Sequence, residues 1–136
     1  MNRKYLYFSL FMVLVFSSCQ NKAQDMNRQA NVSEFKLKQN LEVIQFHSEH
    51  RCQTCLEIEA MTKEAILPYG GIPFRLINVD DSNNKTISYE FRTAGTSLFI
   101  YDPVQNKKLD LTDFAFLNAS DKDKFIKGLQ KEIDNF

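Results

Sequence analysis

Short apolar runs along residues 41–136 indicate where strands form. Residues 41–46, 74–79 and 97–101 are rich in large apolar side chains, as expected for buried strands. Residues 107–111 alternate between polar and apolar positions after a turn that contains proline and asparagine. They predict a fourth strand that closes a hairpin.

Helical spacing of apolar residues predicts three helices between and after these strands. Residues 56–66 have this spacing, and a break rich in proline and glycine follows at 68–73. The polar turn at 80–84 is expected to cap a short helix that ends near Arg92. Ser120 predicts the N-cap of a last helix. The apolar face of that helix consists of Phe125, Ile126, Leu129 and Ile133.

The predicted order of elements is strand, helix, strand, helix, strand, strand and helix, which is typical of an α/β fold. Strand–helix–strand crossovers place parallel strands side by side, and a hairpin adds an antiparallel edge. We therefore expect a central mixed four-stranded sheet with flanking helices. Residues 35–136, roughly 100 residues, are enough for one such domain.

The N-terminal segment, residues 1–19, has the features of a signal peptide. Arg3 and Lys4 precede an apolar stretch at 5–16, which is too short to span a bilayer comfortably. Two serines and Cys19 then follow, an order that resembles a bacterial lipobox. Cleavage and lipidation at Cys19 are expected; the alternative is an ordinary secretory signal that is cut nearby.

Export determines the redox environment of the remaining cysteines. Residues 20–34 are polar and rich in Asn and Gln, and predict a flexible tether between a lipid anchor and the domain. The expected location is the cell envelope, as a membrane-anchored lipoprotein that faces the periplasm, where disulfides persist. If Cys19 is lipidated, Cys52 and Cys55 remain as an even pair.

The balance of charges argues against a nucleic-acid partner. The chain has 17 basic and 17 acidic residues, and removal of residues 1–19 would leave a slight acidic excess. Phosphate binding requires clustered Lys and Arg, and the sequence has no such cluster.

Cys52-Gln53-Thr54-Cys55 places two thiols at the junction between a predicted strand and a predicted helix. A helix N-terminus presents unpaired N–H groups and a partial positive charge, both of which favour a thiolate. We predict a redox-active disulfide that needs no cofactor, in which Cys52 is the nucleophile and Cys55 is the resolving thiol. The alternative is a permanently closed structural disulfide, which stabilises little across so short a loop.

These motifs resemble the thioredoxin superfamily over nearly all of residues 35–136. More narrowly, the chain is similar to a small bacterial family of thioredoxin-like proteins labelled as a nitrophenyl compound nitroreductase subunit and linked to aromatic arsenical resistance. The resemblance implies a thioredoxin-like fold and thiol–disulfide exchange. The segments that support it are Phe46-His47, Arg51 to Cys55, Asn78 to Asp80, Ser97-Leu98 and the run from Leu111 to Asn118.

Some positions depart from thioredoxin. Arg51 replaces a tryptophan, and its guanidinium is expected to stabilise the Cys52 thiolate. Thr96 stands at or next to the position of the cis-proline that faces the dithiol, so this loop is free to be trans and to place a hydroxyl near Cys52. Gln45 lies near the place of a buried acid, which leaves His47 or water to move protons.

Further polar residues around the dithiol have candidate roles. His50 is a candidate proton shuttle, with a solvated loop histidine as the alternative. We favour no metal, but Cys52, Cys55 and His50 are an alternative ligand set for zinc or copper(I). Glu57 and Glu59 are expected on a solvated helix face, where a negative charge near the N-terminus is favourable.

Residues 114–117 form an apolar run after the fourth predicted strand. We expect a loop whose side chains pack in the core. An exposed run would instead mark a docking surface for a partner.

The combined pattern predicts an exported thiol–disulfide oxidoreductase or electron carrier. The reductant direction is preferred, because the domain is too short for the helical insertion of a broad-specificity disulfide oxidase. A protein disulfide or dithiol, or a membrane reductase, is the expected partner. One alternative is a soft-metal or arsenite binding module that uses the same cysteines. Another is a non-catalytic docking subunit of a redox complex.

Overall fold

The computed structural model of the chain describes residue 38 and residues 40–136. The expected signal peptide (1–19), the expected tether (20–34) and Cys19 lie outside the described residues. Within the described part, no helix is both long enough and apolar enough to cross a membrane.

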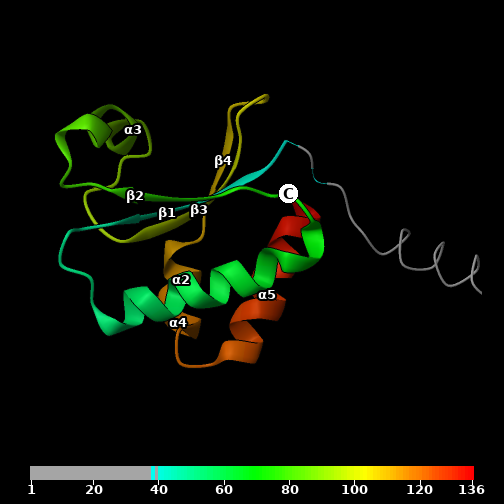
Figure 1. The fold of residues 1–136 in the computed structure, drawn as a ribbon. Helices are drawn as coiled ribbons and strands as arrows, with labels where there is room; N and C mark the ends of the chain where they lie inside the picture. The colour runs from blue at the N-terminus through cyan, green and yellow to red at the C-terminus, as the bar shows by residue number, and fades with distance from the viewer. Residues whose placement is uncertain (1–37, 39) are drawn as a thin grey trace, which may run out of the picture.

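A four-stranded mixed sheet lies at the centre of the described chain (Figure 1). Its strands are β1 (Glu42–His47), β2 (Phe74–Asn78), β3 (Ser97–Asp102) and β4 (Lys107–Asp110), in the order β2-β1-β3-β4. β1 pairs with β2 in parallel and with β3 antiparallel, and β3 pairs with β4 antiparallel. This confirms the predicted α/β fold of the thioredoxin-like type, and each strand begins and ends within one residue of its expected bounds.

The direction of β3 differs from the prediction. The sequence pattern predicts a second parallel crossover, but β3 runs antiparallel beside β1, with Ser97 opposite Phe46 and Tyr101 opposite Glu42. The connecting helix α3 (Lys85–Glu90) has six residues and rises about 9 Å, whereas a strand of six residues is about 20 Å long. The short helix α3 therefore does not carry the chain back to the far end of the sheet, and β3 starts near the end of β2.

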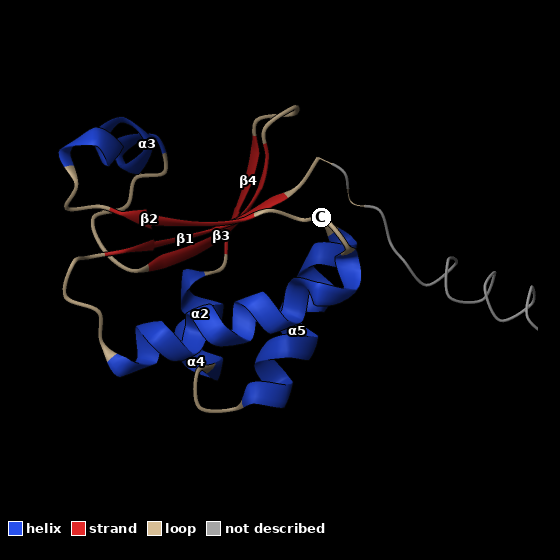
Figure 2. Cartoon of the chain, viewed as in Figure 1, coloured by secondary structure: helices blue, strands red, loops and turns tan. Residues whose placement is uncertain are grey.

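Helices cover both faces of the sheet (Figure 2). α2 (Gln53–Ile66), α4 (Thr112–Asn118) and α5 (Lys122–Asn135) lie on one face, and α3 lies on the other. β1 contributes to both layers, because Val43 packs in the core under α2 and α5 while Phe46 packs in the core on the α3 side. The middle of β1 is therefore fully buried, which explains its nearly continuous apolar sequence.

The apolar run at 114–117 forms part of helix α4 rather than the predicted loop. Its four residues are consecutive, so the sequence shows no helical period there. Phe114 packs against Phe125 of α5 and Ala115 is buried, whereas 80% of Leu117 is exposed. The expected core packing therefore holds for only one face of α4.

Two local features determine how α5 begins and packs. Asp121, rather than the predicted Ser120, is the N-cap, and its Oδ1 accepts a hydrogen bond from the N–H of Lys124 (3.0 Å). The Phe114 ring lies directly over Gly128, where an added Cβ would be 2.5 Å from Phe114 Cε2. A glycine in mid-helix thus allows α4 to approach α5 closely.

Candidate functional site

The two cysteines of the sequence motif form a disulfide at the N-terminus of α2. Cys52 is the N-cap residue, and its Sγ accepts a hydrogen bond from the N–H of Cys55 (3.3 Å). Cys52 is exposed, whereas only 4% of Cys55 is exposed. A partner molecule can therefore reach Cys52 directly but not Cys55, which is the arrangement that a nucleophile and a resolving thiol require.

The loop between β1 and α2 is held in place by the residues that follow β2. The N–H of Val79 donates to the carbonyl of His47 (2.8 Å), and the N–H of Glu49 donates to Asp80 Oδ2 (2.7 Å). Both bonds lie just beyond the carboxyl ends of the parallel strands β1 and β2. The disulfide is thus presented at the sheet edge where α/β proteins commonly place their functional residues.

Thr96 lies against the buried cysteine. Its Oγ1 is 3.3 Å from Cys55 Sγ, whereas the sequence predicts a hydroxyl near Cys52. The peptide bonds of the described residues, including those of this loop, are all trans. The difference arises because Cys55, in the first turn of α2, is turned towards the sheet, while the N-cap Cys52 is turned towards solvent.

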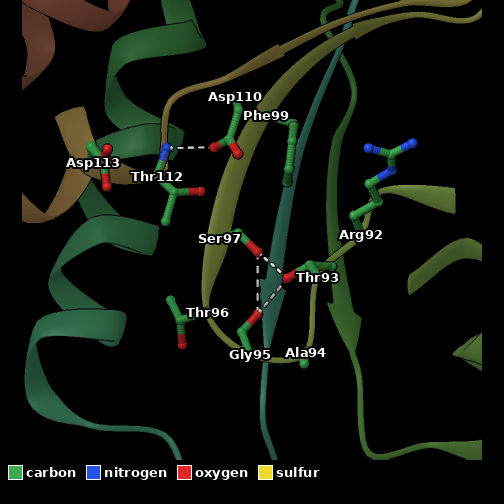
Figure 3. A pocket seen from close by; sticks show the side chains of 10 residues that line it. All are labelled: Arg92, Thr93, Ala94, Gly95, Thr96, Ser97, Phe99, Asp110, Thr112 and Asp113. Carbon is green, nitrogen blue, oxygen red and sulfur yellow. Dashed lines mark hydrogen bonds between the residues drawn. The ribbon is translucent and has the colours of Figure 1, made fainter. Parts of the chain in front are cut away.

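A hydroxyl network fixes the loop that holds Thr96 (Figure 3). Thr93 Oγ1 and Ser97 Oγ each lie within hydrogen-bond distance of the Gly95 carbonyl (3.1 and 3.2 Å), and they are also hydrogen-bonded to each other. Three bonds within five residues restrict the backbone on both sides of Thr96. Its hydroxyl is therefore held at a defined place beside the disulfide.

A cavity of about 500 Å³ lies next to this loop, between it and the start of α4 (Figure 3). Thr96 belongs both to the lining of the cavity and to the contact with Cys55. The polar side chains of the lining come from Arg92, Thr93, Thr96, Ser97, Asp110, Thr112 and Asp113.

Gln45 of β1 also contacts Cys55 and is fully buried. Its Nε2 donates to the backbone carbonyl of Cys55 (2.9 Å). If the Gln45 amide were flipped, its Oε1 and the Cys55 carbonyl oxygen, which are both acceptors, would face each other. The bond therefore determines the orientation of the Gln45 amide. Gln45 Oε1 has no hydrogen-bond partner. The residue thus joins β1 to the first turn of α2 through a group that does not titrate.

Arg51 is paired with a glutamate that the sequence analysis expects to be solvated. Arg51 Nη2 donates to Glu59 Oε2, and Lys63 Nζ donates to Glu59 Oε1. Only 14% of the Glu59 side chain is exposed, so the expectation of a solvated position is wrong for Glu59, although Glu57 is exposed as expected. Residue 59 follows Cys52 by about two helical turns and lies on the same face, where it meets the incoming loop.

The ion pairs of Glu59 change its acidity. Burial alone would raise its pKa, but hydrogen bonds from Lys63 and Arg51, together with their positive charges, hold the pKa of Glu59 below its usual value of 4.5. A carboxyl whose pKa is lowered by folding stabilises the fold above its unfolded-state pKa. This contribution is lost as the pH falls through the lowered pKa.

We expect a Glu59→Gln variant to have a free energy of unfolding about 1–3 kcal/mol lower than that of the wild type at pH 7, because the amide leaves Arg51 without a charged partner. The difference should shrink as the pH falls from 7 to 3, because the unfolded chain takes up a proton at Glu59 more readily than the folded wild type does. Urea unfolding at both pH values measures it. A Glu57→Gln variant, altered at an exposed site, should stay within about 0.5 kcal/mol of the wild type. Equal losses at pH 3 and pH 7 would contradict this account.

The two histidines precede the disulfide: His47 is the last residue of β1, and His50 lies in the loop that follows. His47 Nδ1 is 2.8 Å from the carbonyl of Ser48, and His50 is exposed. Among the residues that the structure describes, no group of three or more His, Cys, Asp or Glu side chains is placed to hold a metal ion. The alternative ligand set of Cys52, Cys55 and His50 is therefore not assembled in the disulfide form.

Comparison with known proteins gives similarity to solved structures but no matching sequence family. No protein-family profile matches the chain, and no curated protein matches it. The X-ray structure of Fasciola hepatica thioredoxin is 19% identical, with a TM-score of 0.39, over 65% of this chain and 77% of that chain. The strand order and pairing described above, rather than this similarity, define the fold. The chain thus has a fold of the thioredoxin-like type and a disulfide between two cysteines three positions apart.

Proposed function

We propose that this chain is a thiol–disulfide oxidoreductase or electron carrier that cycles Cys52 and Cys55 between dithiol and disulfide. The strongest support is the unequal exposure of the two residues: Cys52 is exposed at the helix N-terminus, and only 4% of Cys55 is exposed. A purely structural disulfide does not need one accessible sulfur. The positive end of α2 favours a thiolate at Cys52, whereas the guanidinium of Arg51 is paired with Glu59.

The proposed cycle transfers two electrons. In the reduced form, the Cys52 thiolate attacks a partner disulfide, forms a Cys52–partner bond and displaces one partner sulfur as a thiolate. Cys55 then loses its proton and attacks Cys52 Sγ, which restores the intramolecular disulfide and displaces the second partner sulfur. The partner gains two electrons and two protons overall. A dithiol of a membrane reductase reverses the steps and reduces this chain again.

We also propose the reductant direction and a location on the periplasmic side of the cell envelope, with a lipid on Cys19. The support for the direction is the compact connection between β2 and β3, where α3 has only six residues. The support for the location is the sequence of residues 1–19. Intact mass measurement of the chain extracted from membranes tests the anchor: a mature chain that starts at an acylated Cys19 is expected, and any other start contradicts it.

The redox proposal is tested by equilibrating the full chain with glutathione buffers and counting free Cys52 and Cys55 thiols by alkylation and mass spectrometry. A reversible two-electron transition within roughly −120 to −270 mV is expected, the span of known oxidoreductases. A midpoint near the lower limit supports the reductant direction. Thiols that stay reduced, or a disulfide that never opens, would overturn the redox proposal and favour titration with soft metals or arsenite.

A further inference from the structure

The buried cysteine must exchange a proton during the cycle proposed above, and this inference rests on that cycle. Before Cys55 attacks the mixed disulfide, its S–H has to be deprotonated. Only 4% of Cys55 is exposed, so bulk water has little direct access to the sulfur. A polar group of the protein must therefore connect this sulfur to solvent.

We propose that the Thr96 hydroxyl is this connection and acts as a proton relay between Cys55 and the cavity beside it. Thr96 Oγ1 lies 3.3 Å from Cys55 Sγ, and no other side-chain oxygen or nitrogen of the described residues is hydrogen-bonded to that sulfur. A threonine hydroxyl both accepts and donates a hydrogen bond. It can therefore receive one proton while it releases another.

Gln45, which also contacts Cys55, offers no competing route. It is fully buried and bonds the backbone carbonyl of Cys55, and its amide neither gains nor loses a proton at neutral pH. Among the charged groups near the dithiol, Glu59 is held by Arg51 and Lys63. The proton thus leaves on the side of the loop before β3.

The cavity provides a path for the proton from Thr96 to water. It measures about 500 Å³, Thr96 lines it, and the neighbouring lining includes the hydroxyls of Thr93 and Thr112. A polar cavity of this size can hold water molecules. The bonds from Thr93 and Ser97 to the Gly95 carbonyl hold the loop (Figure 3). Thr96 therefore keeps its contact with the Cys55 sulfur while it lines the cavity.

The relay step balances without an added oxidant. The Cys55 S–H proton moves to Thr96 Oγ1 while the hydroxyl proton of Thr96 moves to water in the cavity. The freed electron pair of Cys55 Sγ forms the bond to Cys52 Sγ, and the partner sulfur leaves with the electron pair of the broken disulfide. During reduction of the chain, the same two protons move in the opposite direction.

Stopped-flow reaction of the reduced full chain with 5,5′-dithiobis(2-nitrobenzoate) separates the two steps, since attack by Cys52 and resolution by Cys55 each release one thionitrobenzoate. A Cys19→Ala background removes the third thiol. We expect Thr96→Val to slow the second release about tenfold or more, with the first release unchanged. Thr96→Ser, which keeps the hydroxyl, should stay close to the wild type. Ser120→Ala removes an exposed hydroxyl outside this loop and is the matched control.

The solvent isotope effect on the second release distinguishes proton transfer through Thr96 from a role of Thr96 in packing alone. In D₂O the second release should slow in the wild type, and this effect should be reduced in Thr96→Val. A second release in Thr96→Val that equals the wild type in rate and in isotope effect would overturn the relay. If the wild type itself shows no second release, the redox cycle fails, whatever Thr96 does. Circular dichroism spectra confirm that each variant is folded.

Discussion

A Cys52→Ser variant is expected to lose nearly all of its disulfide exchange, whereas a Cys55→Ser variant is expected to trap its partner. A serine hydroxyl stays protonated at neutral pH and does not attack disulfides. The buried Cys55 is poorly placed to replace an exposed Cys52, so we expect at least a hundredfold lower rate of attack on a small disulfide. In Cys55→Ser, Cys52 still attacks, but no second thiolate releases the partner.

Counting thionitrobenzoate and trapped partners measures both effects. The wild type, again in a Cys19→Ala background, should release two equivalents from 5,5′-dithiobis(2-nitrobenzoate), and Cys55→Ser only one. In cells, Cys55→Ser should form a disulfide-linked complex that disappears on reduction, and the double variant with both cysteines changed to serine is the control. Full cellular function of that double variant would contradict the proposed cycle and favour a docking subunit.

The sheet could be predicted from the sequence because its strands are local apolar runs. β1 and β3 are buried from both sides by helices, so their sequences stand out without knowledge of their neighbours. The direction of β3 could not be predicted in this way, because it depends on how far the short α3 returns the chain. Helix α4 was missed because its consecutive apolar residues have no helical period.

The candidate site could likewise be predicted where it depends on local sequence, but not where it depends on tertiary packing. The position of Cys52 and Cys55 follows from a local motif at a strand–helix junction, and the disulfide is present. The partner of Arg51 lies eight residues further on, and only the shared helix face of Cys52, Glu59 and Lys63 could have indicated it. The sulfur that Thr96 contacts lies 41 positions away, so it depends on the tertiary packing of α2 against the loop before β3.

The other large effect is expected from Gln45→Glu, which places a carboxyl at a position where the glutamine is fully buried. A protonated carboxyl can replace the Nε2–H as donor to the Cys55 carbonyl, but a carboxylate would face that carbonyl as a second acceptor. Burial and this repulsion both raise the pKa of the introduced group above its unfolded value of about 4.3. The folded variant therefore keeps a proton that the unfolded chain loses.

The sign of the pH dependence follows from this difference. Below about pH 4.3 the variant should be nearly as stable as the wild type, and its relative stability should fall by about 1.4 kcal/mol per pH unit up to the raised pKa. A rise of about three units corresponds to a loss of about 4 kcal/mol, a large share of the stability of a small domain. Urea unfolding between pH 4 and pH 8 measures the loss, with Gln45→Leu as a control whose change should not depend on pH. If the free energy of unfolding had the same pH dependence in Gln45→Glu and in the wild type, water or a positive charge would have to stabilise the carboxylate at this site. The fold would then not require an uncharged residue at position 45.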